Sequence, residues 1–211
     1  MTADNISRDD RASVAYFMRR LYAQGLTSCS GGNISLRVDD ETILITPSAL
    51  DKGELLPEQV VAMKMDGTVL TPGLKPTIEA EMHLMIYRSR PDARAIVHAH
   101  PVFATTFSCI DKPIEVTATP EAIMTIGAIA MAPYHPAGTR ELAEATANAL
   151  GANNVVLMRN HGVAAVGPTL LKAFDRLEVA ELSAKMTWVA HTMNANPAMT
   201  SAQAAAMEAL L

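Results

Sequence analysis

Two histidines separated by one residue, His98 and His100, are the clearest chemical signal in the 211-residue sequence. They end an apolar segment that is typical of a buried strand. In a strand, residues i and i+2 point to the same face, with Cβ atoms roughly 7 Å apart. A metal ion about 2.0–2.1 Å from each ring nitrogen bridges that gap. Pro101 ends the strand, which places the pair at an element terminus, where functional sites usually lie. The alternative is a hydrogen-bonded, inert pair.

A third histidine, His161, favours the metal interpretation. It lies in the tight turn Asn160-His161-Gly162 between two apolar, strand-like segments, so the turn must place it at the edge of a sheet. A lone histidine in a turn is usually a surface residue. Three histidines at such positions, in a chain that has six, match the three-histidine arrangement of a catalytic metal site whose fourth position stays open. His135 and His191 are weaker candidates for metal ligands.

Two carboxylates, Glu79 and Glu81, lie at the start of a helix expected from about Thr77 to Ser89. A helix N-terminus stabilises acidic side chains, so simple dipole complementarity is an alternative for both. Only Glu79 lies four residues before His83 and shares its helix face. Glu79 is therefore the candidate general base, and His83 is a candidate neighbour behind the metal ligands.

Two loops of small polar residues, Gly31-Gly32-Asn33 and Thr46-Pro47-Ser48-Ala49, each adjoin a predicted strand. They offer backbone N–H groups and hydroxyls, as anion-binding loops do. Neither contains a G-x-G-x-x-G or P-loop pattern. Taken alone, the residues favour ordinary turn structure over an anion site.

Composition narrows the class of protein. Hydrophobic residues make up 49% of the chain and charged residues 18%, which excludes intrinsic disorder. A formal net charge of −5 argues against a non-specific nucleic-acid binder. The two cysteines, Cys29 and Cys109, form no C-x-x-C pair and are too few for a disulfide scaffold or a cysteine-built zinc site. The polar N-terminal segment is unlike a signal peptide, and the most apolar run, 122–134, is shorter than the about 18 residues of a membrane span. We expect a cytoplasmic, soluble protein.

The elements that must position these residues are a mixture of helices and strands. We expect a first helix between Ser7 and Gly25, and a hairpin turn at Asp66-Gly67. Further helices are expected at 77–89, after Pro101, at 139–150 and from 168 to about 194, with a short or frayed helix over 201–211. Strands are expected at 34–38, 43–46, 95–99, near 129, at 155–158 and at 163–166. This mixture, without linker or repeat, predicts a single α/β domain over residues 1–211.

Seven short motifs, taken in order, resemble the class II aldolase and adducin-head family, and most of all its L-fuculose-1-phosphate aldolase-like members. The resemblance covers about residues 8–194, and the ordered set is far more specific than any one motif. The motifs are Ser30–Ser35, Ile45–Ser48, Lys75-Pro76-x-x-Glu79, Val97-His98-x-His100, Ala132–Tyr134, Gly138–Leu142 and Asn160–Gly162.

The resemblance implies a three-layer α/β/α sandwich around a mainly antiparallel central sheet, and a homotetramer with active sites between neighbouring subunits. It implies Zn²⁺, or another divalent metal such as Mn²⁺ or Co²⁺, on His98, His100 and His161, with Glu79 as the catalytic acid/base. The phosphate of a small-molecule sugar phosphate would bind a set of loop residues, namely Gly32, Asn33, Ser48, Ala49, Thr77 and Ile78.

The chain departs from the family pattern beside these loops. Fuculose-phosphate aldolases carry a serine pair where this chain has Thr77-Ile78, and a glycine where it has Ala49. Thr119 stands where a neighbouring subunit lends a tyrosine, and no tyrosine follows Tyr134. One hydroxyl is lost and one loop is stiffened, but Thr77 at a helix N-terminus keeps a hydroxyl and free backbone N–H groups, which favour an anion.

The resemblance further implies reversible cleavage of a ketose, such as L-fuculose 1-phosphate, to dihydroxyacetone phosphate and an aldehyde through a metal-stabilised enediolate. The same site could instead run decarboxylation, epimerisation or dehydration. A metal-free, adducin-like binding module is a further alternative, and the presence of all three histidines together with Glu79 argues against it.

Overall fold

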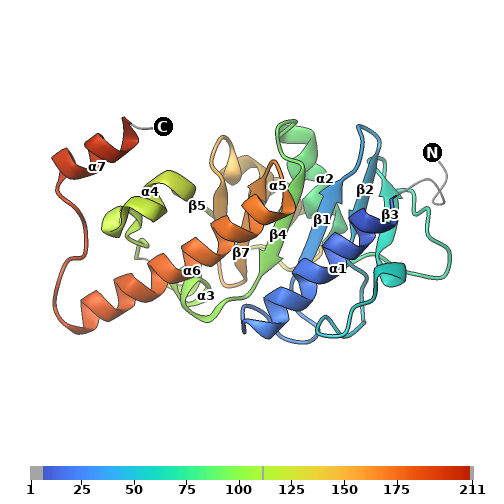
Figure 1. Ribbon diagram of the computed structural model, residues 1–211, viewed down its shortest axis with the longest axis horizontal. Coiled ribbons are helices and arrows are strands. Elements are labelled where there is room, and N and C mark those ends of the chain that lie inside the picture. The colour runs from blue at the N-terminus through green and yellow to red at the C-terminus, as the bar shows by residue number, and fades with distance from the viewer. Residues whose placement is uncertain (1–6, 111, 210–211) are drawn as a thin grey trace.

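Within residues 7–110 and 112–209, which the computed structural model describes, seven strands form one sheet in the order β3-β2-β1-β4-β7-β6-β5 (Figure 1). Neighbouring strands are antiparallel, except for the parallel pair β5 and β6. The strands are β1 (Asn33–Arg37), β2 (Thr42–Ile45), β3 (Val61–Lys64), β4 (Ala95–Ala99), β5 (Ile129–Ala132), β6 (Val155–Met158) and β7 (Gly162–Gly167).

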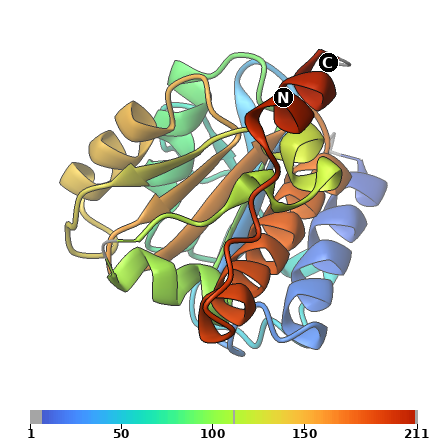
Figure 2. The ribbon, with the colours of Figure 1, turned by 90° about the vertical axis from the view of Figure 1, so that its left-hand side faces the viewer.

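Helices cover both faces of the sheet, which gives the molecule three layers (Figures 1 and 2). The helices on one face are α1 (Arg8–Ala23), α3 (Val102–Cys109) and α6 (Leu170–Thr192). The helices on the other face are α2 (Ala80–Ser89) and α5 (Arg140–Leu150). The predicted three-layer α/β/α sandwich around a mainly antiparallel sheet is confirmed.

Each face of the sheet packs into its own apolar core. Successive side chains of β4 point to opposite faces, so Val97 joins a core with Phe174 of α6, and Ile96 joins a core with Met82 of α2. All five residues of β4 are buried because both faces are covered. A strand covered on both faces is apolar at nearly every position, and in 95–99 only His98 is polar.

Two further helices, α4 (Pro120–Thr125) and α7 (Ser201–Glu208), pack together at one end of the molecule (Figure 1). Single 3₁₀ turns are η2 (Pro57–Gln59) and η3 (Val116–Ala118). The helix expected over 201–211 ends at Glu208, and residues 210–211 of that prediction lie outside the described residues. In the described part of the chain, no helix combines the length and hydropathy needed to cross a membrane.

The helix predicted to begin at about Thr77 begins instead at Ala80. The backbone N–H of Thr77 donates to the carbonyl oxygen of Thr46 at 3.1 Å, and Pro76 forms a β-bridge with Pro47. This pairing with the loop after β2 holds the chain extended and overrides the local helical signal. Glu79 consequently becomes the N-cap residue of α2.

The other predicted elements are present with small shifts at their ends. The Asp66-Gly67 turn forms, with the N–H of Lys64 donating to the carbonyl oxygen of Thr68 at 2.8 Å, but its second arm pairs with β3 through a single bridge. The long helix begins at Leu170 because Thr169 caps it, the threonine hydroxyl accepting from the N–H of Lys172.

Candidate active site

The three histidines singled out in the sequence meet at one end of the central strands. His98 lies in β4, His100 follows that strand, and His161 lies in the turn between β6 and β7. The ring centroids are 4.8 Å apart for His98 and His100, 5.0 Å for His98 and His161, and 5.3 Å for His100 and His161. One nitrogen from each ring lies within 4.8 Å of the others. This spacing suits three ligands around one ion, each about 2.0–2.1 Å from it.

The sheet register and one glycine bring these distant residues together. His98 of β4 lies opposite Ala164 of β7, so the β6–β7 turn reaches the end of β4. Asn160 takes the left-handed conformation that this turn needs, with φ 54°. A Cβ at Gly162 would lie 2.5 Å from a carbonyl oxygen of β4 and 2.7 Å from the His100 ring. Only glycine therefore lets β7 pass this close to His100.

The Glu79 carboxylate lies against two of the histidines. Its Oε2 is 3.2 Å from Nε2 of His98, and its Oε1 is 3.1 Å from Nε2 of His161. Glu79 is buried, whereas Glu81 is at the surface and pairs with Arg88 at 3.1 Å. The N-cap position of Glu79 aims its side chain back toward the strand ends, so Glu79 alone of the two carboxylates joins the histidines.

The electrostatics of the cluster favour a positive charge at its centre. Burial by itself raises the pKa of Glu79, but the charges and hydrogen bonds of His98 and His161 outweigh burial and hold that pKa well below its usual range. Burial lowers the pKa of His98, and the Glu79 carboxylate overrides that effect and raises it. An ionised carboxylate this deeply buried needs positive charge beside it, from a histidine or from a bound cation.

The nitrogen atoms of the cluster fit a divalent metal ion. Nδ1 of His98 donates to the carbonyl oxygen of Val163 at 2.9 Å, which turns Nε2 toward the other rings. This Nε2 faces Nε2 of His100 at 3.1 Å. Burial and the nearby His98 lower the pKa of His100 to about 3, so its ring is neutral at neutral pH and has a lone pair to donate. The buried Nδ1 of His161 has no hydrogen-bond partner among the described residues.

A buried chain of hydrogen bonds holds Glu79 from behind. Asn33 Nδ2 donates to Glu79 Oε2 at 2.8 Å, and Asn33 Oδ1 accepts from His83 Nε2 at 2.5 Å. The Ser35 hydroxyl donates to His83 Nδ1 at 2.6 Å and lies 2.8 Å from the Tyr87 hydroxyl. His83 and Tyr87 are fully buried. These hydrogen bonds link the core of the protein to the Glu79 carboxylate and fix the orientation of that carboxylate. His83 reaches Glu79 only through Asn33.

A cavity of about 220 Å³ opens in front of Glu79. All the predicted site residues line this cavity except His98, which is fully buried behind it. The predicted residues in its wall are Gly32, Asn33, Ser48, Ala49, Thr77, Ile78, Glu79, His100 and His161. The structure thus brings together the candidate metal ligands, the candidate base and the candidate phosphate loops.

Backbone hydrogen bonds tie the loops of the cavity to one another. The N–H of Ser48 donates to the carbonyl oxygen of Lys75 at 2.9 Å, and the N–H of Lys52 donates to the carbonyl oxygen of Cys29 at 2.8 Å. Gly32 has φ +65°, and a Cβ there would lie 2.9 Å from the carbonyl oxygen of His98. The loops are therefore held in place before any ligand arrives.

The positions that depart from the family pattern have distinct environments. The Thr77 hydroxyl accepts from Asn33 Nδ2 at 3.2 Å, and the Thr77 N–H is bonded to Thr46, so the expectation of a free N–H at Thr77 is wrong. The pairing that delays α2 removes that donor. Ile78 is 68% exposed although it lines the cavity. Ala49 adopts φ 58°, a conformation that glycine reaches with less strain.

Lys52 is a residue of this cavity that no sequence pattern indicated. It lies between Asp51 and Gly53, a context typical of an exposed loop, yet it is only 2% exposed. The role of Asn33 as the link between Glu79 and His83 was also missed, because nothing local predicts which side chain an amide will contact.

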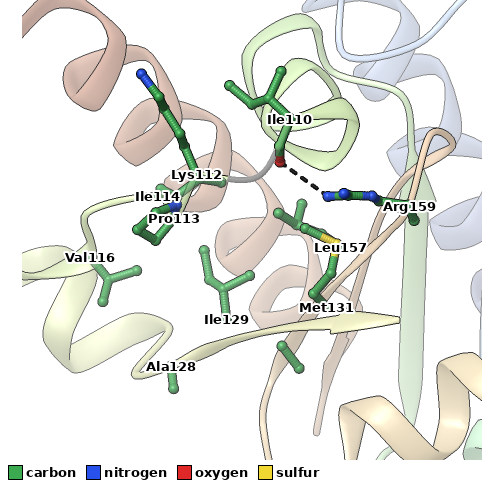
Figure 3. A pocket seen from close by; sticks show the side chains of 11 residues that line it. Ile110, Lys112, Pro113, Ile114, Val116, Ala128, Ile129, Met131, Leu157 and Arg159 are labelled. Carbon is green, nitrogen blue, oxygen red and sulfur yellow. Dashed lines mark hydrogen bonds between the residues drawn. The ribbon is translucent and has the colours of Figure 1, made fainter. Parts of the chain in front are cut away.

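A second cavity, of about 450 Å³, lies away from the histidines (Figure 3). Its walls include apolar side chains such as Ile129 and Leu157, and its two charged residues are Lys112 and Arg159. The Arg159 guanidinium donates to the carbonyl oxygen of Ile110 at 3.2 Å, drawn as a dashed line. These walls offer neither a carboxylate base nor a metal ligand, so the smaller cavity at Glu79 is the candidate active site.

Comparison with known proteins agrees with this fold. The family described as Class II Aldolase and Adducin N-terminal domain matches residues 12–188. The chain therefore belongs to the class II aldolase and adducin family.

Individual relatives differ in the reaction that their names state. The L-fuculose phosphate aldolase of Methanocaldococcus jannaschii is 38% identical over 178 residues, covering 84% of this chain and 95% of the relative. The 3-oxo-tetronate 4-phosphate decarboxylase of Haemophilus influenzae is 36% identical over 172 residues, covering 80% and 81%. A solved structure of an L-fuculose 1-phosphate aldolase superposes with a TM-score of 0.88 at 31% identity, covering 96% of this chain and 95% of that one.

Proposed function

We propose that this protein is a metal-dependent aldolase that reversibly cleaves a ketose 1-phosphate, such as L-fuculose 1-phosphate, to dihydroxyacetone phosphate and an aldehyde. The observation that carries the proposal is the placement of one buried carboxylate, Glu79, against a three-histidine cluster at the floor of a small cavity. The aldolases among the relatives support the choice of reaction.

His98, His100 and His161 would hold the divalent ion, and Zn²⁺, Mn²⁺ and Co²⁺ all suit imidazole ligands. When bound, such an ion supplies positive charge that stabilises the negative charge developing on the carbonyl oxygen of the substrate. The backbone carbonyl of Val163 holds the His98 ring in the orientation that this binding needs.

Glu79 is the group that moves the proton. Breaking the C3–C4 bond of the ketose turns the C4 hydroxyl into the carbonyl of the departing aldehyde, with release of the hydroxyl proton to solvent, and leaves the three-carbon half as an enediolate. Glu79 takes up a proton from solvent and delivers it to C3 of the enediolate, which becomes the terminal carbon of the product. In the synthetic direction the ionised carboxylate removes that proton again, and its lowered pKa keeps it ionised at neutral pH. Asn33, itself held by His83, keeps the carboxylate aimed at the reacting carbon.

Decarboxylation is the second candidate, because relatives from Haemophilus influenzae and Pectobacterium atrosepticum carry the name 3-oxo-tetronate 4-phosphate decarboxylase. Loss of CO₂ from such a β-keto acid produces the same dihydroxyacetone phosphate enediolate. Protonation of this enediolate at carbon then gives dihydroxyacetone phosphate and completes the reaction. The two reactions differ only in the group that leaves. The proposed role of Glu79 is therefore common to both.

Proton exchange tests the shared step and product analysis separates the two reactions. Metal-loaded protein in D₂O should incorporate deuterium into dihydroxyacetone phosphate at carbon. The protein is then incubated with ketose 1-phosphates and with 3-oxo-tetronate 4-phosphate, and aldehyde and CO₂ are measured. Aldehyde release supports the aldolase, and CO₂ release the decarboxylase. No exchange with Zn²⁺, Mn²⁺ or Co²⁺ would favour a metal-free, adducin-like binding module.

We also propose that the chain acts as a single domain in a homotetramer with active sites between subunits. The family resemblance supports this assembly. Light scattering coupled to size-exclusion chromatography should report four chains per particle, and a fully active monomer would contradict the shared active site.

A further inference from the structure

Lys52 combines three features that are rarely found together in a lysine. It follows the Pro47–Ala49 loop, it is 2% exposed, and it lines the same cavity as Glu79. Its Nζ donates to the carbonyl oxygen of Pro47, which anchors the ammonium group under that loop. Lysine is almost never this buried unless it is paired with an acid.

No acid pairs with Lys52 in the described part of the chain. The ion pairs formed there involve other basic residues, and Lys52 is absent from them. An ammonium group has three N–H donors, and the Pro47 carbonyl takes one of them. Burial lowers the pKa of Lys52 to about 8, so the group is still mostly charged at neutral pH. Keeping an uncompensated charge out of water is unfavourable.

The surroundings of Lys52 suit a compact anion. The cavity that Lys52 lines is also lined by small residues, among them Gly31, Gly32, Ser48 and Ala49, which leave room for a ligand and bring backbone groups close to it. The backbone bonds that tie these loops together keep the space open. A buried cation in a preformed space with no acid partner is a site that lacks its counter-ion.

We propose that Lys52 is the counter-charge for the phosphate monoester of the substrate, bound between the ammonium group and the Gly31–Asn33 and Ser48–Ala49 loops. A phosphate monoester fits better than a carboxylate because its three terminal oxygens can accept from both loops and from the ammonium group at once. Lys52 thereby supplies binding energy where the chain has lost a hydroxyl at Ile78. The inference rests on the proposed function, since the phosphate belongs to the same substrate.

Phosphate affinity tests this role without relying on turnover. Binding of inorganic phosphate, and separately of acetate, to metal-loaded protein is measured by calorimetry for the wild type, Lys52→Met and the surface control Lys172→Met. Phosphate affinity of Lys52→Met should fall by about 10–100-fold, the worth of a hydrogen bond to a charged group. Lys172→Met should bind as the wild type does. Unchanged phosphate affinity in Lys52→Met overturns the proposal, and an equal loss for acetate overturns the assignment to phosphate.

Two further measurements test the proposal even if Lys52→Met does not fold. Lys52→Gln removes the charge but keeps a donor for the Pro47 carbonyl, so it should fold and show the same loss. In wild-type protein with ¹³C-labelled lysine, the Lys52 ε-carbon signal should shift on phosphate addition, and an unmoved signal contradicts the proposal.

Deuterium exchange separates failure of this proposal from failure of the proposed function. In Lys52→Met the KM for dihydroxyacetone phosphate should rise by the same 10–100-fold, while exchange into unphosphorylated dihydroxyacetone stays at the wild-type rate. A wild-type KM in Lys52→Met overturns the role of Lys52 and leaves the proposed function intact. No exchange by the wild type, together with a phosphate affinity that depends on Lys52, removes the proposed function and keeps the anion site.

Discussion

The candidate active site has two walls, and they differ in how completely their polar groups are partnered within the chain. On the histidine wall, Glu79 contacts two histidines and an asparagine, and the asparagine is itself held by His83. On the loop wall, buried Lys52 lines the cavity, and its ammonium group has one carbonyl oxygen as its partner among the described residues.

The comparison teaches that the two walls are specialised differently. The histidine wall is built to orient groups that take part in bond breaking, and a small displacement there is costly for catalysis. The loop wall is left incomplete for a charged ligand to satisfy. Changes at the histidine wall should therefore reduce the rate, and changes at the loop wall should reduce substrate affinity.

The largest expected effect is that of Glu79→Gln. This change keeps the size and hydrogen bonding of the side chain but removes the base, so deuterium exchange into dihydroxyacetone phosphate should fall by about 10²–10⁴-fold. Metal content, measured by elemental analysis, should stay near the wild-type value because the histidines are intact. Glu81→Gln is the matched control and should change exchange little, since Glu81 lies at the surface. Full loss in Glu81→Gln with full activity in Glu79→Gln would show that the base has been assigned to the wrong carboxylate.

His98→Ala tests the same wall through metal binding. Protein purified without chelator should hold close to one divalent ion per chain. Loss of a hydrogen-bond partner behind a metal ligand lowers metal affinity by about 10–100-fold. Loss of the ligand itself in His98→Ala should lower the affinity by more than this. His191→Ala, at an exposed position of α6, should retain the ion. Equal metal content in the two variants would contradict the three-histidine site.

Acid stability tests the hydrogen-bonded chain behind Glu79. Burial lowers the pKa of His83 to about 3, whereas a histidine in the unfolded chain has a pKa of about 6.5. Between these pH values the unfolded state binds a proton that the folded state does not. Neutral, buried His83 therefore makes its full contribution to the free energy of unfolding above about pH 6.5. That contribution is lost as the pH falls toward 3, by about 1.4 kcal/mol per pH unit.

The measurement is urea unfolding of metal-free protein between pH 6.5 and 4.5. His83→Gln should be less stable than the wild type at pH 6.5 and should show a shallower fall in the free energy of unfolding. Parallel pH curves for the two proteins would show that His83 is not held neutral in the folded state.

The smallest expected effect is a gain on the loop wall. Ile78→Ser restores a hydroxyl at the exposed position beside the cavity. Water competes for a hydrogen bond at such a position, so the bond is worth about 0.5–1.5 kcal/mol. The KM for a phosphorylated substrate should therefore fall by about 2–12-fold, with the KM for its unphosphorylated counterpart as the control. Equal changes for both substrates would show that the new hydroxyl does not contact the phosphate.

Local patterns in the sequence were sufficient where a residue's partners follow from its own element. The alternation of a strand places His98 and His100 on one side, and the apolar run 95–99 identifies the strand as buried. These relations depend on backbone geometry over a few residues, so they hold without knowledge of the rest of the fold.

The tertiary structure decided everything that depends on the sheet register. Thr77 is extended because Thr46 takes its N–H, and this pairing makes Glu79 the N-cap of α2. Asn33 contacts Glu79 because β1 lies beside β4, and the burial of Lys52 follows from the loops that close over it. Such contacts join residues that are distant in sequence, and no local periodicity specifies which distant segments will pair.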